Sequence, residues 1–264
     1  MAFPVRVLAP NPGPFTLDGT NTWVVGRSPC VVIDPGPDDA GHLDEVARTA
    51  GRVAAIVLTH RHPDHAPGAA SFARITGGQV WAFDPAPDAR RLDDGAEVRG
   101  GEATLRAVHT PGHTPDHVAM FDEASGILFT GDAVLGRGTS VIDPPEGDLV
   151  AYLGSLQGML DLRPRVLCPG HGPVVWDADA KLRAYIDHRA DRERQIVEAL
   201  AAGPATPEEL VPGIYTDVPA SIHPVAARSV LAHLLALEHT GEAVRDGDRF
   251  ALAPHQRSGG SSTT

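Results

Sequence analysis

The sequence predicts an α/β domain followed by a small domain of helices and one hairpin. In residues 1–176, short apolar runs alternate with segments whose apolar residues recur at helical spacing, which is typical of an α/β fold. Beyond residue 176 the strand-like runs stop and helical segments rich in charge take over. We therefore expect a first domain over 1–176, a connector helix and second domain over 177–257, and a flexible polar tail over 258–264.

The first domain is expected to contain eight strands and three helices. Strands are predicted where β-branched and apolar residues form short runs that end at Gly, Pro or Asp, and helices where apolar residues return every three or four positions. The expected strands are 21–26, 30–33, 53–58, 79–83, 103–108, 118–121, 127–129 and 165–167, and the expected helices are 42–50, 64–75 and 149–160.

The second domain resembles a winged helix in its order of elements. A long charged helix is expected over 181–201, and Thr206 followed by Pro207 has the pattern of a capped short helix. A longer helix over 224–238 can end at Gly241. A hairpin then follows, with Asp246-Gly247 at its turn.

Composition predicts a soluble protein of a reducing compartment. Hydrophobic residues make up 42% of the chain and charged residues 21%, and no segment has the pattern of a signal peptide or a membrane span. Cys30 and Cys168 lie far apart beside apolar runs, which fits buried thiols better than a disulfide. We therefore expect a cytoplasmic protein with no membrane partner.

The charge of the chain disfavours nucleic acid as a partner. The net charge is -12, which repels phosphate backbones. From His188 onward seven arginines stand against ten carboxylates, leaving -3, and the expected recognition helix has only Arg228 as a fixed positive charge. We interpret the second domain as a packing, substrate-gating or dimerisation module, which leaves a homodimer open.

A dense cluster of metal-binding residue types follows the strand that ends at residue 58. His60, His62, Asp64 and His65 lie within six positions. In an extended segment alternate side chains share a side, so the first two imidazoles point together, and a turn can bring the other two donors to a neighbouring point. Two adjacent metal ions can use all four donors, whereas one ion cannot easily do so. The alternative is a polar loop with chance histidines.

Three further donors follow later strands. His113, Asp132 and His171 each lie just after an expected strand, next to glycine or proline residues that let the backbone turn sharply. Any one of them taken singly fits an ordinary core or turn residue. Together with the first cluster they complete a site.

These motifs resemble those of the metallo-β-lactamase superfamily of hydrolases. The resemblance covers residues 1 to about 176 and implies a four-layer αβ/βα sandwich. The segments 11–17 and 19–22, with the winged-helix-like second domain, further resemble a branch that includes mitochondrial endoribonucleases and β-lactamase-like proteins of uncertain substrate. The residues that carry the main match are Asp34, His60, His62, Asp64, His65, His113, Asp132 and His171.

The resemblance also implies a role for each of these residues. His60, His62 and His113 would bind a first metal, Asp64, His65 and His171 a second, and Asp132 would bridge the two. Asp34 would orient a ligand or loop instead of binding metal, because ligating imidazoles commonly donate their second N–H to a carboxylate. Nitrogen and oxygen donors fit two Zn²⁺ ions, and also manganese or iron.

Other residues near the motifs are candidates for catalysis and substrate binding. A hydroxide that bridges two metal ions would attack the substrate, so Asp132 is a catalytic candidate as the bridging ligand. His117 is a second, because it can position substrate or protonate a leaving group, although a structural histidine fits equally. Arg137 and Tyr152 are candidate substrate contacts, for which a solvated loop and a core aromatic are equally good explanations.

Three functions remain open at this point. The first is hydrolysis of a small ester, thioester or lactam; the second is cleavage of single-stranded RNA; the third is nucleic-acid-binding regulation through the second domain. A two-metal site is competent for a phosphodiester as well as for a carbonyl. The negative charge favours the small-molecule substrate.

Overall fold

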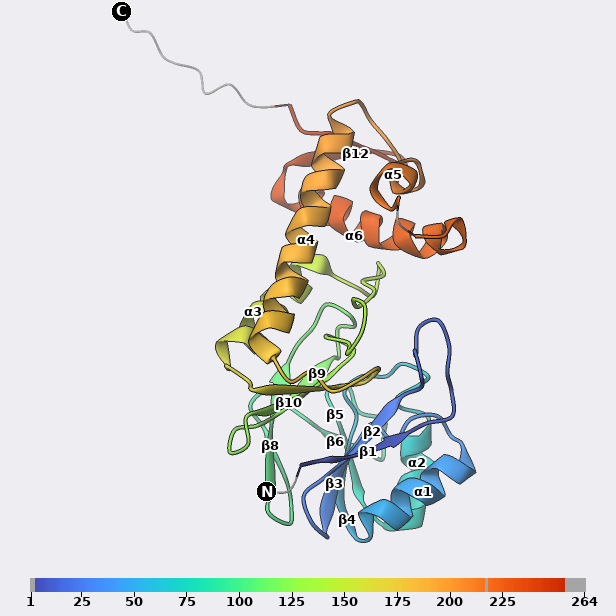
Figure 1. Cartoon of the computed structure of the whole chain (residues 1–264), viewed down its shortest axis with the longest axis vertical. Coiled ribbons are helices and arrows are strands. Elements are labelled where there is room, and N and C mark those ends of the chain that lie inside the picture. The colour runs from blue at the N-terminus through green and yellow to red at the C-terminus, as the bar shows by residue number, and fades with distance from the viewer. Residues whose placement is uncertain (1–2, 217, 255–264) are drawn as a thin grey trace, which may run out of the picture. The chain divides into compact units, whose positions relative to one another are not determined.

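The computed structural model describes residues 3–216 and 218–254 (Figure 1). The chain divides into two compact units, one up to Asp187 and one from His188. The division falls inside helix α4 (Ala178–Leu200), the expected connector helix. The expected tail over 258–264 lies outside the described residues, and the expected domain boundary at residue 176 stays a prediction.

Two sheets form the centre of the first unit. The six-stranded sheet has the order β1 (Val5–Leu8), β2 (Asn21–Val25), β3 (Cys30–Ile33), β4 (Val53–Val57), β5 (Gln79–Ala82) and β6 (Arg90–Arg91). The five-stranded sheet has the order β11 (Val166–Pro169), β10 (Ile127–Gly131), β9 (Val118–Asp122), β8 (Ala103–His109) and β7 (Glu97–Gly100).

The six-stranded sheet buries both of its faces, and β3 shows how. Because successive side chains of a strand point to opposite faces, Val31 and Ile33 enter the core between the two sheets. Val32 points the other way, into a second core that contains Val46 and Phe72. Those two residues come from α1 (Ala40–Ala50) and α2 (Gly68–Thr76), so these helices cover the outer face.

The five-stranded sheet has its helix on the side away from the other sheet. Helix α3 (Leu149–Asp161) lies there in Figure 1, and it begins at Asp148, whose side chain accepts the backbone N–H of Ala151. Its side chains Tyr152, Leu156 and Met159 are fully buried. The layers are therefore helix, sheet, sheet, helix, and the expected αβ/βα sandwich is confirmed.

The second unit has the expected helices and hairpin. Helix α5 (Pro207–Ile214) begins at the expected cap, Thr206, and a capping box adds to it, because Thr206 and Glu209 bond each other's backbone N–H. The other elements are the short η1 (Ala220–Ile222), α6 (His223–Thr240), β12 (Ala243–Asp246) and β13 (Arg249–Leu252). Helix α6 ends at Gly241 in the left-handed conformation, which a glycine adopts without strain.

One helical stretch of the described chain has the length and composition of a membrane span. It runs from Ala220 to Thr240 with a mean hydropathy of 1.3. Its apolar residues Val230 and Leu234 are fully buried in the core of the second unit. A core helix of a water-soluble domain has the same properties, so the stretch is weak evidence for a membrane.

The structure corrects two local expectations. The helix expected from Asp64 begins only at Gly68, because Pro67 disfavours helical backbone at Ala66 and the N–H of Gly68 donates to Gly36 O. Strands β1, β6 and β7 were not predicted. They are only two to four residues long, and their sequences lack a run of consecutive apolar residues because at least every second residue is exposed.

Candidate metal centre

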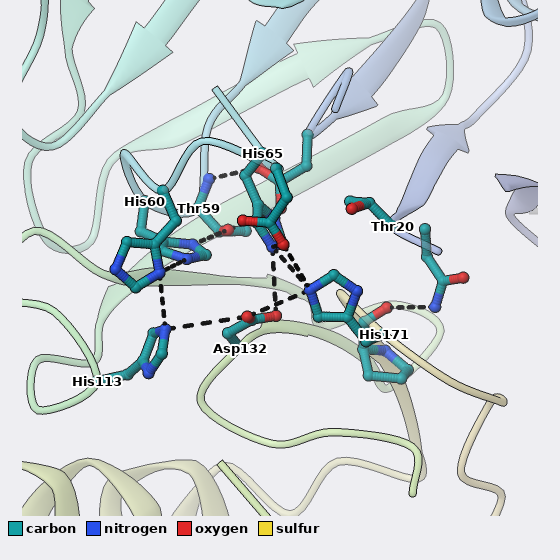
Figure 2. A network of polar contacts seen from close by, with 12 residues as sticks. Thr20, Thr59, His60, His65, His113, Asp132 and His171 are labelled. Atoms are coloured by element: carbon teal, nitrogen blue, oxygen red, sulfur yellow. Dashed lines mark hydrogen bonds and ion pairs between the residues drawn. The ribbon is translucent and has the colours of Figure 1, made fainter. Parts of the chain in front are cut away.

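The seven predicted donors meet where strands of both sheets end, and Figure 2 labels five of them. The segment after β4 supplies four of them, and this strand belongs to the six-stranded sheet. In the other sheet, His113 lies in the β8–β9 connection, Asp132 directly follows β10, and His171 lies two residues after β11. The sandwich therefore brings together residues that are far apart in the chain.

Three of the donors form a first group of imidazoles. Nδ1 of His62 lies 3.0 Å from Nε2 of His60 and 3.1 Å from Nε2 of His113. The three ligand atoms all lie within 4.8 Å of one another. Three ring nitrogens that converge in this way have the spacing and chemistry of a metal site.

The other four donors form a second group, and it is more deeply buried. Nε2 of His171 lies 3.2 Å from Nε2 of His65 and 3.0 Å from Oδ2 of Asp64. The carboxylate of Asp132 lies 3.4 Å from His65 Nε2 and 3.3 Å from His171 Nε2. Two carboxylates and two imidazoles suit a divalent cation.

Asp132 also reaches the first group. Its Oδ2 lies 3.9 Å from Nε2 of His113. Its Oδ1 is buried and makes no hydrogen bond with the described residues, and such an atom costs free energy unless a cation or donor satisfies it. Asp132 therefore lies where one carboxylate can serve both groups.

One carboxylate sets the orientation of an imidazole in each group. Asp34 Oδ2 accepts the Oγ1–H of Thr59 at 2.7 Å and the Nδ1–H of His65 at 2.9 Å. Because Thr59 donates its only proton to Asp34, its oxygen accepts the Nδ1–H of His60 at 3.0 Å. Nε2 of both His60 and His65 is thereby the ring nitrogen that faces the other donors. Asp34 has a φ of 50°, a conformation that aspartate tolerates better than most residues.

Backbone carbonyls orient two more imidazoles. His113 Nδ1–H donates to Val141 O at 2.9 Å, and His171 Nδ1–H donates to Gly19 O at 3.1 Å. In both rings the second nitrogen, Nε2, faces its donor group. Ligating histidines are commonly held in this way.

The charges of the second group reinforce one another. Burial raises the pKa of Asp132, but the charge of His65 and the hydrogen bond from His171 outweigh it and hold this pKa well below its ordinary value. Burial lowers the pKa of His171, and the hydrogen bonds to Asp132 and Asp64 outweigh it and raise the pKa to about 9. The carboxylate of Asp132 is thus ionised, as a metal ligand must be.

A glycine keeps space open at the centre. A Cβ at Gly170 would lie 2.5 Å from Oδ1 of Asp132 and 2.8 Å from Cε1 of His65. Both distances are too short for any side chain. The close approach of this backbone to the donors therefore requires glycine.

Two of the other candidates, His117 and Tyr152, are fully buried. The backbone N–H of Asp132 donates to His117 Nε2 at 3.1 Å, so Nδ1 carries the proton and donates to Thr110 Oγ1 at 2.8 Å. These contacts fit the alternative of a structural histidine, and the catalytic role of His117 stays a prediction. Tyr152 is also fully buried and its hydroxyl donates to Ala133 O, which fits a core aromatic.

Arg137 is placed differently from these two. It is well exposed and pairs with Asp18 at 3.4 Å. The neighbouring Gly136 donates its N–H to His171 O, so Arg137 lies beside the loop of a predicted ligand. Arg137 stays a candidate for substrate binding.

The structure adds residues that the sequence analysis missed. Thr59 connects Asp34 to His60. In the sequence, the only indication of this role is that Thr59 directly precedes the histidine cluster. Glu146 lies 3.8 Å from the outer nitrogen of His62 and accepts two hydrogen bonds from Arg61. No spacing in the sequence connects Glu146 with the cluster.

Comparison with known proteins identifies the family. Residues 15–86 and 80–171 match the Metallo-beta-lactamase superfamily, and residues 206–251 match the Beta-lactamase associated winged helix domain. The chain belongs to the metallo-beta-lactamase superfamily. It is a hydrolase of this fold with a winged helix domain, as the sequence analysis expected.

Similar proteins include one whose name states an activity. The chain is 35% identical over 263 residues to a Beta-lactamase-like protein 2 homolog of Drosophila melanogaster, covering 90% of this chain and 88% of that protein. It is also 35% identical over 240 residues to an atrochrysone carboxyl ACP thioesterase of Aspergillus fumigatus, covering 83% and 75%. A metallo-beta-lactamase family protein of Thermus thermophilus shares the fold, with a TM-score of 0.80 and 22% identity over 94% and 98% of the two chains.

Proposed function

We propose that this hydrolase cleaves thioesters at a centre of two metal ions. The observation that carries the proposal is the position of the Asp132 carboxylate, which contacts the second donor group and lies 3.9 Å from His113 of the first. The thioesterase name of a relative that is 35% identical supports this class of substrate. Thioesters belong to the small carbonyl substrates that the negative charge of the chain favours.

The donors fit two ions, and we propose zinc. His60, His62 and His113 would hold one ion, Asp64, His65 and His171 the other, and Asp132 would be shared. All donors are nitrogen or oxygen, which suits zinc and also accommodates iron or manganese. When bound, such ions supply Lewis acidity toward the carbonyl oxygen and activate water as a nucleophile.

The protein itself supplies orientation and a dry environment. Asp34 and Thr59 hold two of the imidazoles, and the bond from Asp132 N–H to His117 fixes the turn that follows β10. His60, His65 and His171 are almost completely buried, so little water competes at these donors. Electrostatic interactions with a reacting carbonyl are stronger in such surroundings.

A hydrolysis screen of metal-loaded protein tests the proposal. It compares kcat/KM for acyl thioesters, lactones, β-lactams and single-stranded RNA, the last at low and moderate salt. We expect thioesters to be the best substrates and RNA to be cleaved poorly, because a polyanion is repelled by a chain of net charge -12. Efficient RNA cleavage without thioester hydrolysis would overturn the proposed substrate.

Elemental analysis of the same protein tests the metal content. We expect about two ions per chain from the two donor groups. His60→Ala is expected to lose activity and to bind fewer ions while the protein stays folded. His239→Ala is the matched control, because His239 is exposed in the second unit. One ion per fully active chain would contradict the paired centre.

A further inference from the structure

A pocket with mixed charges lies in the first unit beside the candidate metal centre. Two residues that line the pocket are close in the chain to predicted metal ligands. Arg61 lies between the donors His60 and His62, and Asp116 follows the donor His113 by three positions. The pocket has a volume of about 180 Å³ and is lined by Arg61, Phe83, Asp84, Arg91, Pro115 and Asp116.

The wall of the pocket is held in place by stacked rings. The rings of Phe83 and His109 are parallel within 5°, with their centroids 3.9 Å apart. The guanidinium of Arg91 lies 5.2 Å from the centroid of Phe83. His109 Nε2–H donates to Pro115 O at 2.9 Å, which ties the stacked rings to a second lining residue. These contacts give the wall of the pocket a defined shape.

Both arginines of the pocket are oriented by carboxylates and keep donors to spare. Arg61 donates through Nε and one NH₂ group to Glu146, at 3.2 and 2.7 Å, and lies 3.7 Å from Asp84. Arg91 donates through Nε to Asp93 at 2.7 Å. A guanidinium has five N–H donors, so each arginine can still donate to a bound acceptor.

Asp116 offers a hydrogen-bond acceptor, whereas the two arginines offer donors. Its side chain is nearly buried, with 7% of the residue exposed, and its Oδ1 has no hydrogen-bond partner among the described residues. A buried carboxylate oxygen without a partner costs free energy. A ligand that brings a hydrogen-bond donor would remove this cost.

The lining favours a neutral ligand over an ion. Its two arginines and two aspartates leave the pocket without net charge, so neither a phosphate nor a cation is attracted by it overall. A purely apolar group would leave the carboxylate of Asp116 without a donor. A neutral group that has one donor and one acceptor satisfies both walls, and an amide is such a group. The volume of about 180 Å³ has room for an amide with short alkyl flanks.

We propose that this pocket binds an amide in the thiol arm of the thioester substrate. The amide N–H donates to Asp116, and the amide carbonyl accepts from Arg61 or Arg91. Acyl groups on carrier proteins are thioesters of a pantetheine arm, whose first amide is separated from the sulfur by a short ethylene spacer. A pocket next to the metal centre receives that amide when the thioester carbonyl lies at the metals. This inference rests on the proposed thioesterase function.

A pair of substrates that differ in one group tests the inference. The first is an acyl thioester of N-acetylcysteamine, and the second is the same acyl thioester of the ketone analogue in which CH₂ replaces the amide N–H. The ketone keeps the acceptor and loses the donor. We expect kcat/KM of the metal-loaded wild-type protein to be about tenfold or more higher for the amide, the effect of one hydrogen bond to a charged acceptor.

Two variants test whether the preference for the amide depends on Asp116. In Asp116→Ala the ratio of kcat/KM for the amide to kcat/KM for the ketone is expected to fall to near one. In Asp44→Ala this ratio is expected to stay as in the wild type. Asp44 is an exposed carboxylate of α1 and serves as the matched control. The thioether S-methyl-N-acetylcysteamine, which cannot be hydrolysed, is expected to inhibit the wild type competitively and not Asp116→Ala.

The outcomes separate the two proposals. Equal rates of the wild type on both thioesters, or no inhibition by the thioether, would overturn the amide subsite and leave the thioesterase function standing. A full preference retained by folded, metal-loaded Asp116→Ala would also overturn it. Absence of any thioester hydrolysis would overturn the proposed function and this inference with it. The comparison of the two thioesters with the wild-type protein tests the amide subsite even if Asp116→Ala does not fold.

Discussion

Asp34 accepts the hydroxyl proton of Thr59 across 2.7 Å, and this contact connects one carboxylate with both donor groups. The same oxygen of Asp34 accepts the Nδ1–H of His65, while Thr59 accepts the Nδ1–H of His60. A residue outside both groups therefore fixes the ring orientation in each of them. Changes at the two ends of this network are expected to affect metal binding differently.

Asp34→Asn is expected to weaken metal binding in both groups. Asparagine tolerates the φ of 50° at this position, so the backbone stays, but its neutral amide is a poorer acceptor for Thr59 and His65. Loss of such a supporting group lowers metal affinity by about 10- to 100-fold. Competition with a chromophoric chelator measures the affinities. Unchanged affinity for both ions would show that Asp34 does not orient the ligands.

Thr59→Val separates the two branches of this network. Valine has nearly the shape of threonine and removes only the hydroxyl that connects Asp34 with His60. The hydrogen bond from His65 to Asp34 is unaffected. We expect one of the two ions to bind more weakly and the other to bind as in the wild type, in the same chelator titration. Equal weakening of both ions would argue against two independent branches.

His117 is expected to stabilise the fold instead of transferring protons. His117→Ala leaves the buried Asp132 N–H without its acceptor, while Thr110 Oγ1 loses the ring N–H and keeps the backbone O of residue 117. The variant is expected to lose about 2–5 kcal/mol of unfolding free energy, since a buried unpaired group costs about 1–3 kcal/mol and the cavity adds to it. His117→Gln is expected to restore part of the loss, because its carbonyl can accept from Asp132. Urea denaturation measures both variants. Wild-type stability in His117→Ala with loss of kcat alone would point to a catalytic role.

A chain that ends at Asp187 is expected to keep its metal ions. The last predicted ligand is His171, and the division between the two units falls after Asp187. Tyr185, whose hydroxyl accepts the N–H of Leu135 and donates to Gly138 O, remains in the shortened chain. Elemental analysis and circular dichroism check the expectation. A folded fragment without metal would show that the second unit helps to hold the ions.

The second unit is expected to lose stability in mild acid. Burial, followed by the positive charges of Arg189 and Arg192, lowers the pKa of His188 from 6.5 to about 4, with His233 adding to the effect and Asp191 opposing it. The unfolded chain therefore binds the proton more readily than the folded one. The contribution of neutral His188 to stability is complete above about pH 6.5 and is lost as the pH falls toward about 4.

Thermal unfolding of the full chain between pH 7 and 4 measures this effect. His188→Gln is expected to flatten the pH dependence, because glutamine cannot be protonated in this range. His239→Gln is the control, since His239 is exposed. A slope that is the same in His188→Gln and in the wild type would assign the acid sensitivity to other groups.

Features formed by neighbours in the chain could be predicted from the sequence, whereas contacts between distant segments could not. The histidine cluster that starts at His60 could be recognised because its donors are neighbours in the chain. The roles of Thr59 and Glu146 could not, because they follow from contacts with Asp34, Arg61 and His62 that only the folded sandwich creates. His117 was ambiguous for the same reason. Its two partners, Thr110 and Asp132, became known only with the positions of β9 and β10.

The donors of the centre come from both sheets, and His65 and His171 are 106 positions apart. Closing so long a segment costs chain entropy, so a nascent chain cannot complete the second donor group until β11 has been synthesised and placed in its sheet. An ion proposed for this group would consequently be acquired late in biosynthesis, by molecules whose two sheets have already joined. Once bound, it would draw the equilibrium away from unfolded chains. In the proposed centre, a full complement of metal would therefore mark molecules that have matured correctly.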